Sequence, residues 1–185
     1  LAFTVVGVPA WLIAFAIAQR SLRTAREAEV GSELRRTYLN LARGIALVVV
    51  AVNALTVLES VFGLGGFDGR ALGWLLVWGV IWLVHDLFVR SEPRTSATAW
   101  ADELYLGFAS ILGLALLLSG IGGALSAVLS DAYDSLFRDA LVRSEWSRGL
   151  REAALPAIVG AVIWAWHWLL QLRREPRTHL IWQVV

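Results

Sequence analysis

The sequence Ile81-Trp82-Leu83-Val84-His85 returns 82 residues later as Ile163-Trp164-Ala165-Trp166-His167. Each copy leads into an arginine-containing block, Arg90-Ser91-Glu92-Pro93-Arg94-Thr95 in the first and Arg173-Arg174-Glu175-Pro176-Arg177-Thr178 in the second. The spacing between the two arginine-containing blocks is one residue longer than the spacing between the two preceding copies, as an insertion would produce. Self-similarity of this kind is the mark of a structural repeat, so the chain is predicted to be an internal duplication.

The composition is typical of a membrane protein. Of the 185 residues, 58% are hydrophobic and 17% are charged, and the charged residues gather in short stretches between long apolar runs. The chain has no cysteine, which excludes disulfides, thiolate metal sites and a cysteine nucleophile. It also has no phosphate-binding Gly-Lys-Ser/Thr loop and no His-Glu-x-x-His zinc motif. We therefore expect neither an enzyme nor a cofactor.

Five apolar stretches are long enough to cross a hydrocarbon layer of roughly 30 Å, which takes about 20 helical residues. Lipid offers no partner for a free backbone N–H, and no strand-like alternation supports a barrel, so all five are predicted to be α-helices. The predicted fold class is all-α, a polytopic transmembrane bundle of five helices built from parallel two-helix repeats. The five crossings are Leu1–Gln19, Tyr38–Phe62, Ala71–Val89, Leu104–Leu129 and Ala154–Leu172.

The predicted helices divide the chain into three parts. Residues 1–37 hold the second helix of a truncated repeat and a cytoplasmic connector, and residues 38–100 hold one two-helix repeat. Residues 101–185 hold a second repeat and a cytoplasmic tail. Within it, residues 130–152 place apolar and charged side chains on different faces of a helix, so this insertion is predicted to be a helix lying in the outer interface of the membrane.

All 16 basic residues are arginine, and most fall on one side of the predicted membrane. Because cytoplasmic loops collect arginine, we expect the richer side and the C-terminus to be cytoplasmic and Leu1 to lie outside. This basic face favours anionic lipid head groups over nucleic acid as a partner. The richer side holds Arg20, Arg23, Arg26, Arg35, Arg36, Arg43, Arg90, Arg94, Arg173, Arg174 and Arg177; the other holds Arg70, Arg138, Arg143, Arg148 and Arg151.

The repeat unit combines Tyr-Leu at the start of one helix with Trp-x-x-His near the end of the next. Together with motifs upstream, this pattern resembles the bacterial membrane family filed as domain of unknown function 5671, over nearly the whole chain apart from residues 130–152. The resemblance implies tandem two-helix repeats in a prokaryotic inner membrane, and it carries no assigned activity. Ala14 and Asp86 depart from the family pattern, where a histidine and a second tryptophan are expected. The matching motifs are Gly7-x-Pro9-x-Trp11, Ala18-Gln19-Arg20, Arg35-Arg36-Thr37-Tyr38-Leu39 and Trp164-x-x-His167-Trp168.

His85 and His167 are the candidates for chemistry, because the repeat places both imidazoles at the same depth. They could ligate a b-type haem from opposite faces. Alternatively, since His85 is five residues before Arg90, roughly 7 to 8 Å along a helix, they could lie in an interfacial aromatic belt as polar anchors or as interhelical hydrogen bonders. We favour the belt.

Other polar and small residues are predicted to pack helices. Asp86 can pair with Arg90 four residues later, and Arg43 can extend back to the basic side without a special role. Asn53, near the middle of its helix, is expected to bond a neighbouring helix. Gly113, Gly120 and Gly123 belong to the glycine-rich fourth helix, which is expected to pack most closely.

Three functions remain open from the sequence. The first is a structural or accessory subunit that packs against other membrane proteins or against itself. The second is a transporter or channel, for which parallel repeats are a known plan. The third is a haem- or quinone-associated redox subunit that uses the two histidines. The scarcity of buried charge and the small-residue helix faces favour the first.

Overall fold

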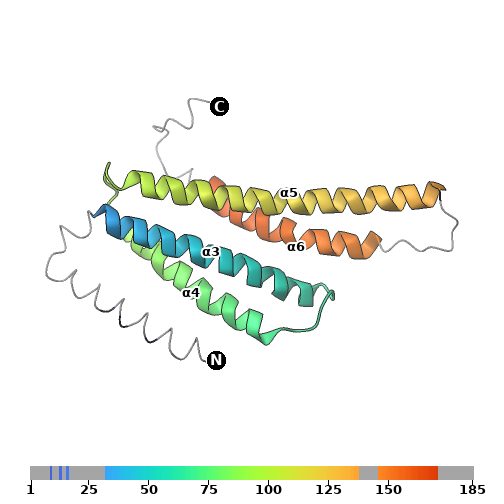
Figure 1. Ribbon diagram of the computed structural model, residues 1–185, viewed down its shortest axis with the longest axis horizontal. Helices are drawn as coiled ribbons and strands as arrows, with labels where there is room; N and C mark the ends of the chain where they lie inside the picture. Colours follow the sequence, from blue (N-terminus) through green and yellow to red (C-terminus); the bar gives the residue numbers. More distant parts are fainter. Residues whose placement is uncertain (1–8, 10–12, 14–15, 17–31, 138–145, 171–185) are drawn as a thin grey trace.

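The computed structural model describes residues 9, 13, 16, 32–137 and 146–170, and within them the ordered elements are all helices (Figure 1). Four long α-helices are followed by one short π-helix. The elements are α3 (Glu33–Val61), α4 (Gly69–Ser91), α5 (Ala99–Phe137), α6 (Trp146–Trp164) and η1 (Ala165–Leu170).

Each of the four long helices is long and apolar enough to cross a membrane. They correspond to the second to fifth predicted crossings, which confirms the all-α class for the described part of the chain. The first predicted crossing, Leu1–Gln19, lies outside the described residues except at Pro9, Ile13 and Ala16. Only 11% to 33% of each helix's most apolar window is buried, so most of the apolar surface faces outward.

The helices form two antiparallel hairpins, α3 with α4 and α5 with α6. In Figure 1, α3 and α5 run in one direction and α4 and α6 return in the other. The turn between α3 and α4 uses Gly63, whose φ of +68° is easily adopted only without a side chain. Asp68 then caps α4, because its carboxylate accepts the Arg70 N–H at 2.8 Å and the Ala71 N–H at 3.3 Å.

The predicted interfacial helix over residues 130–152 is wrong in the described part of that range. Residues 130–137 continue α5, which does not end at Leu129, and residues 146–152 begin α6. The sequence contains neither glycine nor proline between Gly123 and Phe137, so nothing there interrupts the helix. With 39 residues, α5 is about 58 Å long and projects beyond the end of α6 (Figure 1).

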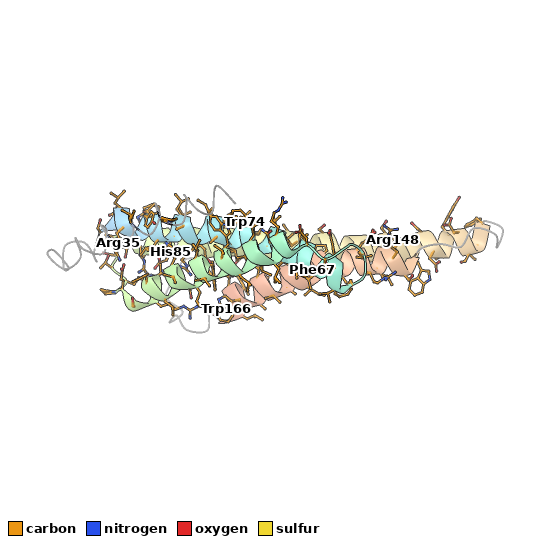
Figure 2. All side chains as sticks on the ribbon, turned by 90° about the horizontal axis from the view of Figure 1, so that it is seen from below. Arg35, Phe67, Trp74, His85, Arg148 and Trp166 are labelled. Carbon is orange, nitrogen blue, oxygen red and sulfur yellow. The ribbon has the colours of Figure 1, made fainter. Side chains whose placement is uncertain are left out.

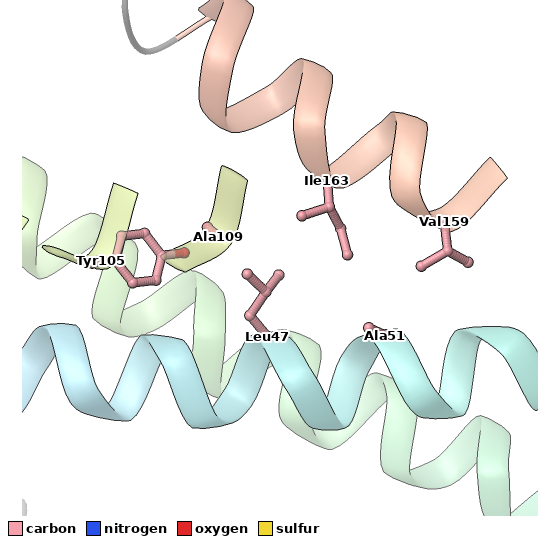
Figure 3. Packing of buried hydrophobic residues seen from close by; sticks show 6 residues of the cluster. All are labelled: Leu47, Ala51, Tyr105, Ala109, Val159 and Ile163. Carbon is pink, nitrogen blue, oxygen red and sulfur yellow. The ribbon is translucent and has the colours of Figure 1, made fainter. Parts of the chain in front are cut away.

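A small apolar core joins three of the helices. Leu47 and Ala51 come from α3, and they face α5 and α6 in the centre of the bundle (Figure 3). In contrast, the backbone of α4 lies close to that of α3 alone among the described helices. The buried residues of this core are Leu47, Ala51, Tyr105, Ala109, Val159 and Ile163.

The closest helix packing is between α5 and α6, at Gly160 of α6 and at glycines of α5. A methyl group added to Gly113 would lie 2.6 Å from the Trp164 backbone nitrogen, and one on Gly120 would lie 2.5 Å from that of Ala157. Gly123 is less crowded, with the Ala153 Cβ at 3.2 Å. Two of the three glycines therefore let the helix backbones touch directly.

Two glycines of α5 that are two residues apart test this packing. Gly120→Ala should lower the free energy of unfolding by about 1–3 kcal/mol, because its methyl group would meet the α6 backbone. Gly122→Ala should leave it unchanged or raise it, since nothing lies within 4 Å of that position. Thermal unfolding in detergent, followed by tryptophan fluorescence, measures both. Equal effects of the two substitutions would contradict the packing.

Candidate functional site

A cluster of buried polar side chains lies at the end of the bundle where α4 is followed by α5. Arg36, Asn40 and Arg43 contribute to it from α3, and they share one helix face because they are spaced by four and three residues. All three side chains are buried. Figure 2 places Arg35 and His85 toward this end of the molecule and Phe67 and Arg148 toward the other.

Asp102, in the first turn of α5, joins α5 to α3. Its carboxylate accepts two hydrogen bonds from Arg36, at 2.7 Å from Nε and 2.6 Å from Nη2, in a bidentate pair. The remaining Arg36 Nη1 donates to the carbonyl of Val89 at 2.8 Å, so this one guanidinium connects three helices. Asn40 Nδ2 also donates to Asp102, at 2.7 Å.

Asp86 joins α4 to α3 in the same way. The predicted pair with Arg90 is confirmed, at 2.6 Å. Arg43 Nη2 approaches the other carboxylate oxygen, also at 2.6 Å, although Arg43 was expected to extend to the membrane surface. The Asp86 side chain is only 3% exposed, so its negative charge needs close compensation. Arg90 is partly exposed to solvent, and the buried Arg43 supplies the second positive charge.

Arg43 also connects this cluster to an aromatic one. Its guanidinium carbon lies 3.8 Å from the centre of the Tyr105 ring, in cation–π geometry, and its Nη1 donates to the Asn40 side-chain oxygen at 2.9 Å. Sequence reasoning missed the roles of Arg36, Asn40 and Arg43. Their spacing along one face of a predicted apolar helix was the signal that could have revealed them.

Tyr105 lies between Trp82 and His167, and the three side chains form a directed chain of hydrogen bonds. The Trp82 indole can only donate, so its N–H donates to the Tyr105 oxygen at 2.9 Å. The Tyr105 hydroxyl then donates to His167 Nε2, also at 2.9 Å. His167 Nδ1 lies 2.9 Å from the Ile163 carbonyl, which can only accept. The chain is therefore satisfied by a neutral imidazole protonated at Nδ1.

The two repeated histidines lie in matching surroundings. His85 Nδ1 lies 2.7 Å from the Ile81 carbonyl, and His167 Nδ1 lies 2.9 Å from the Ile163 carbonyl. Each imidazole also meets, edge to face, a tyrosine in the first two turns of the first helix of its hairpin. The ring centres are 6.0 Å apart for Tyr38 and His85 and 5.5 Å apart for Tyr105 and His167. Both histidines are fully buried, with exposures of 0% and 1%.

His167 is poorly suited to ligate a haem in this arrangement, because both of its ring nitrogens are engaged within the protein. Iron would have to displace either the Tyr105 hydroxyl or a backbone carbonyl. Among the residues that the structure describes, no three His, Asp or Glu side chains form a group that could hold a metal ion.

His167 lies in the π-helix η1, which the sequence reasoning did not predict. A π-helix has a wider turn than an α-helix and is found frequently at functional sites. Here it spans Ala165–Leu170, the segment that carries His167 and the tryptophans Trp166 and Trp168. Trp82 contacts this segment edge to face, with ring centres 6.3 Å from Trp166 and 6.2 Å from His167.

Asn53 does not contribute to the cluster. It was expected to bond a neighbouring helix, but its amide donates to the Val49 carbonyl, one turn earlier in α3, at 2.7 Å. An asparagine can satisfy its donor on its own helix in this way when no partner is within reach. Glu59 is exposed toward the far end of α3.

A polar pocket of about 250 Å³ opens between α3, α4 and α5 beside this cluster. Its walls carry four arginines and four carboxylates, so the charges balance. They belong to Arg36, Arg43, Arg90, Arg94, Asp86, Glu92, Asp102 and Glu103.

Asp86→Asn tests whether the buried charges depend on one another. The substitution should lower the free energy of unfolding by about 3–5 kcal/mol, because it leaves the Arg43 guanidinium buried without a counter-charge. The double change Arg43→Met with Asp86→Leu should recover most of this loss, since it removes both charges.

A control for this experiment is Glu152→Gln, which breaks the exposed pair with Arg148 and should cost no more than about 1 kcal/mol. Chemical unfolding in detergent measures all three variants. A double variant as unstable as Asp86→Asn would refute the interdependence.

Comparison with known proteins gives one match. The family described as Domain of unknown function (DUF5671) matches residues 1–80. That range includes Arg36, Asn40 and Arg43, whereas Asp86, Asp102, Tyr105 and His167 lie beyond it. No curated protein and no solved structure matches the chain. The resemblance seen in the sequence motifs is thus confirmed over residues 1–80, which match the DUF5671 family model.

Proposed function

We propose that this protein is an integral protein of a prokaryotic cytoplasmic membrane and serves as a structural or accessory subunit of a larger membrane assembly. In this proposal the polar cluster fixes the helices at the arginine-rich end. The apolar outer faces are left for lipids and for other membrane subunits.

One observation carries the proposal: buried polar side chains of the cluster are bonded to side chains of other helices. Arg36 of α3 pairs with Asp102 of α5, and Arg43 of α3 pairs with Asp86 of α4. The hydroxyl of Tyr105 in α5 is bonded to His167 in η1. Side chains that bond one another across helices fix the arrangement of those helices, which is what a structural role requires.

The second candidate is a transporter or channel, which the parallel hairpins and the polar pocket beside Asp86 favour. A transport path must extend through the midplane. In the described residues the centre of the bundle beyond Tyr105 is filled by Leu47, Ala51, Val159 and Ile163. This apolar core favours the accessory role.

The distribution of arginine supports an orientation. Arg35, Arg36, Arg90 and Arg94 lie together in the polar cluster and its ion pairs. At the other end Arg151 of α6 donates to the Phe62 carbonyl after α3, at 3.3 Å. The end with more arginine is the one proposed to face the cytoplasm, together with the C-terminus.

Single cysteines can test this orientation directly, because the chain has none of its own. A thiol at Ser91→Cys should be protected from a membrane-impermeant maleimide in intact cells and react after lysis. Gly66→Cys, in the turn after α3, should react in intact cells. Labelling of both positions from the same side would contradict the crossing of α4.

The accessory role predicts a stable complex. Extraction of the native protein in mild detergent should recover other membrane proteins in a fixed stoichiometry, identified by mass spectrometry. The variant Asp86→Asn should lose them, because it loosens the helix arrangement, while Glu152→Gln should keep them. Solute flux through liposomes that contain only the purified chain would instead establish the transporter.

A further inference from the structure

The polar pocket beside Asp86 has features that a role in helix packing leaves unexplained. Two buried polar atoms of residues that line it have no hydrogen-bond partner among the described residues. They are Oε2 of Glu92 and Nε of Arg43, and the side chains that carry them are only 8% and 4% exposed. Buried polar atoms are rarely left unpaired, because each one loses its bonds to water without replacement. The pocket therefore offers one acceptor and one donor to a molecule from outside the chain.

Arg90 adds a cation at the edge of the same pocket. Its Nε lies 2.6 Å from Asp86, and this is its one ion pair within the described part of the chain. The terminal nitrogens, Nη1 and Nη2, take no part in that pair. The side chain is 36% exposed, so a ligand can reach it. Guanidinium N–H groups in this parallel arrangement match the oxygens of a phosphate group.

The charges on the walls restrict the ligand to a molecule that carries both signs. Four arginines and four carboxylates line the pocket, so the walls are neutral as a whole. A purely anionic ligand would leave Oε2 of Glu92 without a donor. A purely cationic ligand would leave Arg43 and Arg90 without an acceptor. The complementary ligand is a zwitterion that has an anionic group for the arginines and an N–H donor for the carboxylate.

The size and position of the pocket indicate the head group of a lipid. At about 250 Å³ it is smaller than the roughly 300–1,000 Å³ of sites that enclose a whole small ligand. It lies between the last two turns of α4 and the first two turns of α5, where Val89 and Leu106 give it an apolar margin. The ends of membrane-spanning helices lie at the level of the lipid head groups. A ligand that places its charged part in the pocket and its apolar part in the bilayer meets both conditions.

We propose that this pocket binds the head group of a phosphatidylethanolamine molecule from the cytoplasmic leaflet. The inference rests on the membrane placement proposed above. The phosphate accepts hydrogen bonds from Arg90 and from Nε of Arg43, and the ammonium group donates to Oε2 of Glu92. Small movements of these side chains bring the two buried atoms to the ligand.

The amine of the ligand must carry a hydrogen. A choline head group has three methyl groups on its nitrogen and no N–H to donate to Glu92. Proteins bind such quaternary groups on open aromatic faces. Among the described residues that line the pocket, Tyr105 is the one aromatic, and the Arg43 guanidinium already lies 3.8 Å from its ring centre. The pocket therefore discriminates against phosphatidylcholine, and phosphatidylglycerol lacks the cation that Glu92 needs.

Lipids that differ only in the methylation of the amine test this site on the unchanged chain. The purified protein in detergent is titrated with phosphatidylethanolamine, its N-methyl and N,N-dimethyl derivatives and phosphatidylcholine, all with the same acyl chains. Native mass spectrometry measures the fraction of chains that hold one lipid. The Kd should rise about tenfold or more at the last methyl group, because only that step removes the last N–H.

Glu92→Gln tests the residue that receives the amine. The carboxamide oxygen can still accept from Arg35, whose Nε and Nη2 bond Oε1 of Glu92 at 2.9 and 2.7 Å. Its NH₂ group replaces the free acceptor by a donor, so the preference for phosphatidylethanolamine over phosphatidylcholine should disappear. Glu152→Gln, the same substitution in the exposed pair with Arg148, should keep the preference. Thermal unfolding checks that both variants are folded, and the methylation series decides if Glu92→Gln is not.

Three results would overturn the site. The first is equal binding of phosphatidylethanolamine and phosphatidylcholine by the unchanged chain. The second is an undiminished preference in folded Glu92→Gln. The third is binding of soluble glycerophosphoethanolamine as tight as that of the lipid, which would assign the pocket to a solute. All three leave the accessory role intact, whereas failure of the labelling test at Ser91→Cys and Gly66→Cys would remove the membrane placement.

Discussion

The buried charge of Asp86 is the constraint on which the rest of the bundle depends. A carboxylate that is 3% exposed needs compensation, and two arginines from different helices supply it. Arg43 can do so only if α3 and α4 keep their present register. Because the same guanidinium lies over the Tyr105 ring, this register also fixes α5. Tyr105 in turn positions His167, so one ion pair orders four elements.

The sequence predicted the helices well and the polar cluster poorly. Long apolar runs with glycine turns define α3, α4 and the closely packed face of α5, because these depend on local composition. The Asp86–Arg90 pair was also predictable, since its partners are four residues apart on one helix. Arg43 was misjudged because its partners Asp86 and Tyr105 are distant in sequence. A lone arginine near a helix end reads equally well as a surface anchor.

The far end of α5 shows a different limit of sequence reasoning. Residues 130–137 mix apolar side chains with serine and aspartate, a composition that fits a helix lying in the interface and equally a helix projecting beyond it. Only the absence of a helix breaker before Phe137 distinguishes the two. The π-helix η1 was unpredictable for a related reason, because its sequence is ordinary for a membrane helix and its wider turn arises where Tyr105 and Trp82 contact His167.

The two hairpins also differ in the side chains that they carry at equivalent positions. If the paired tyrosines and the paired histidines are aligned, Arg43 corresponds to Ser110 and Asp86 corresponds to Trp168. The first hairpin thus carries a buried ion pair where the second carries neutral side chains. Ser110 is small and buried, which leaves room for the backbones of α5 and α6 to approach at Gly113. The first hairpin thus holds the buried charges, and the second brings its helix backbones into direct contact.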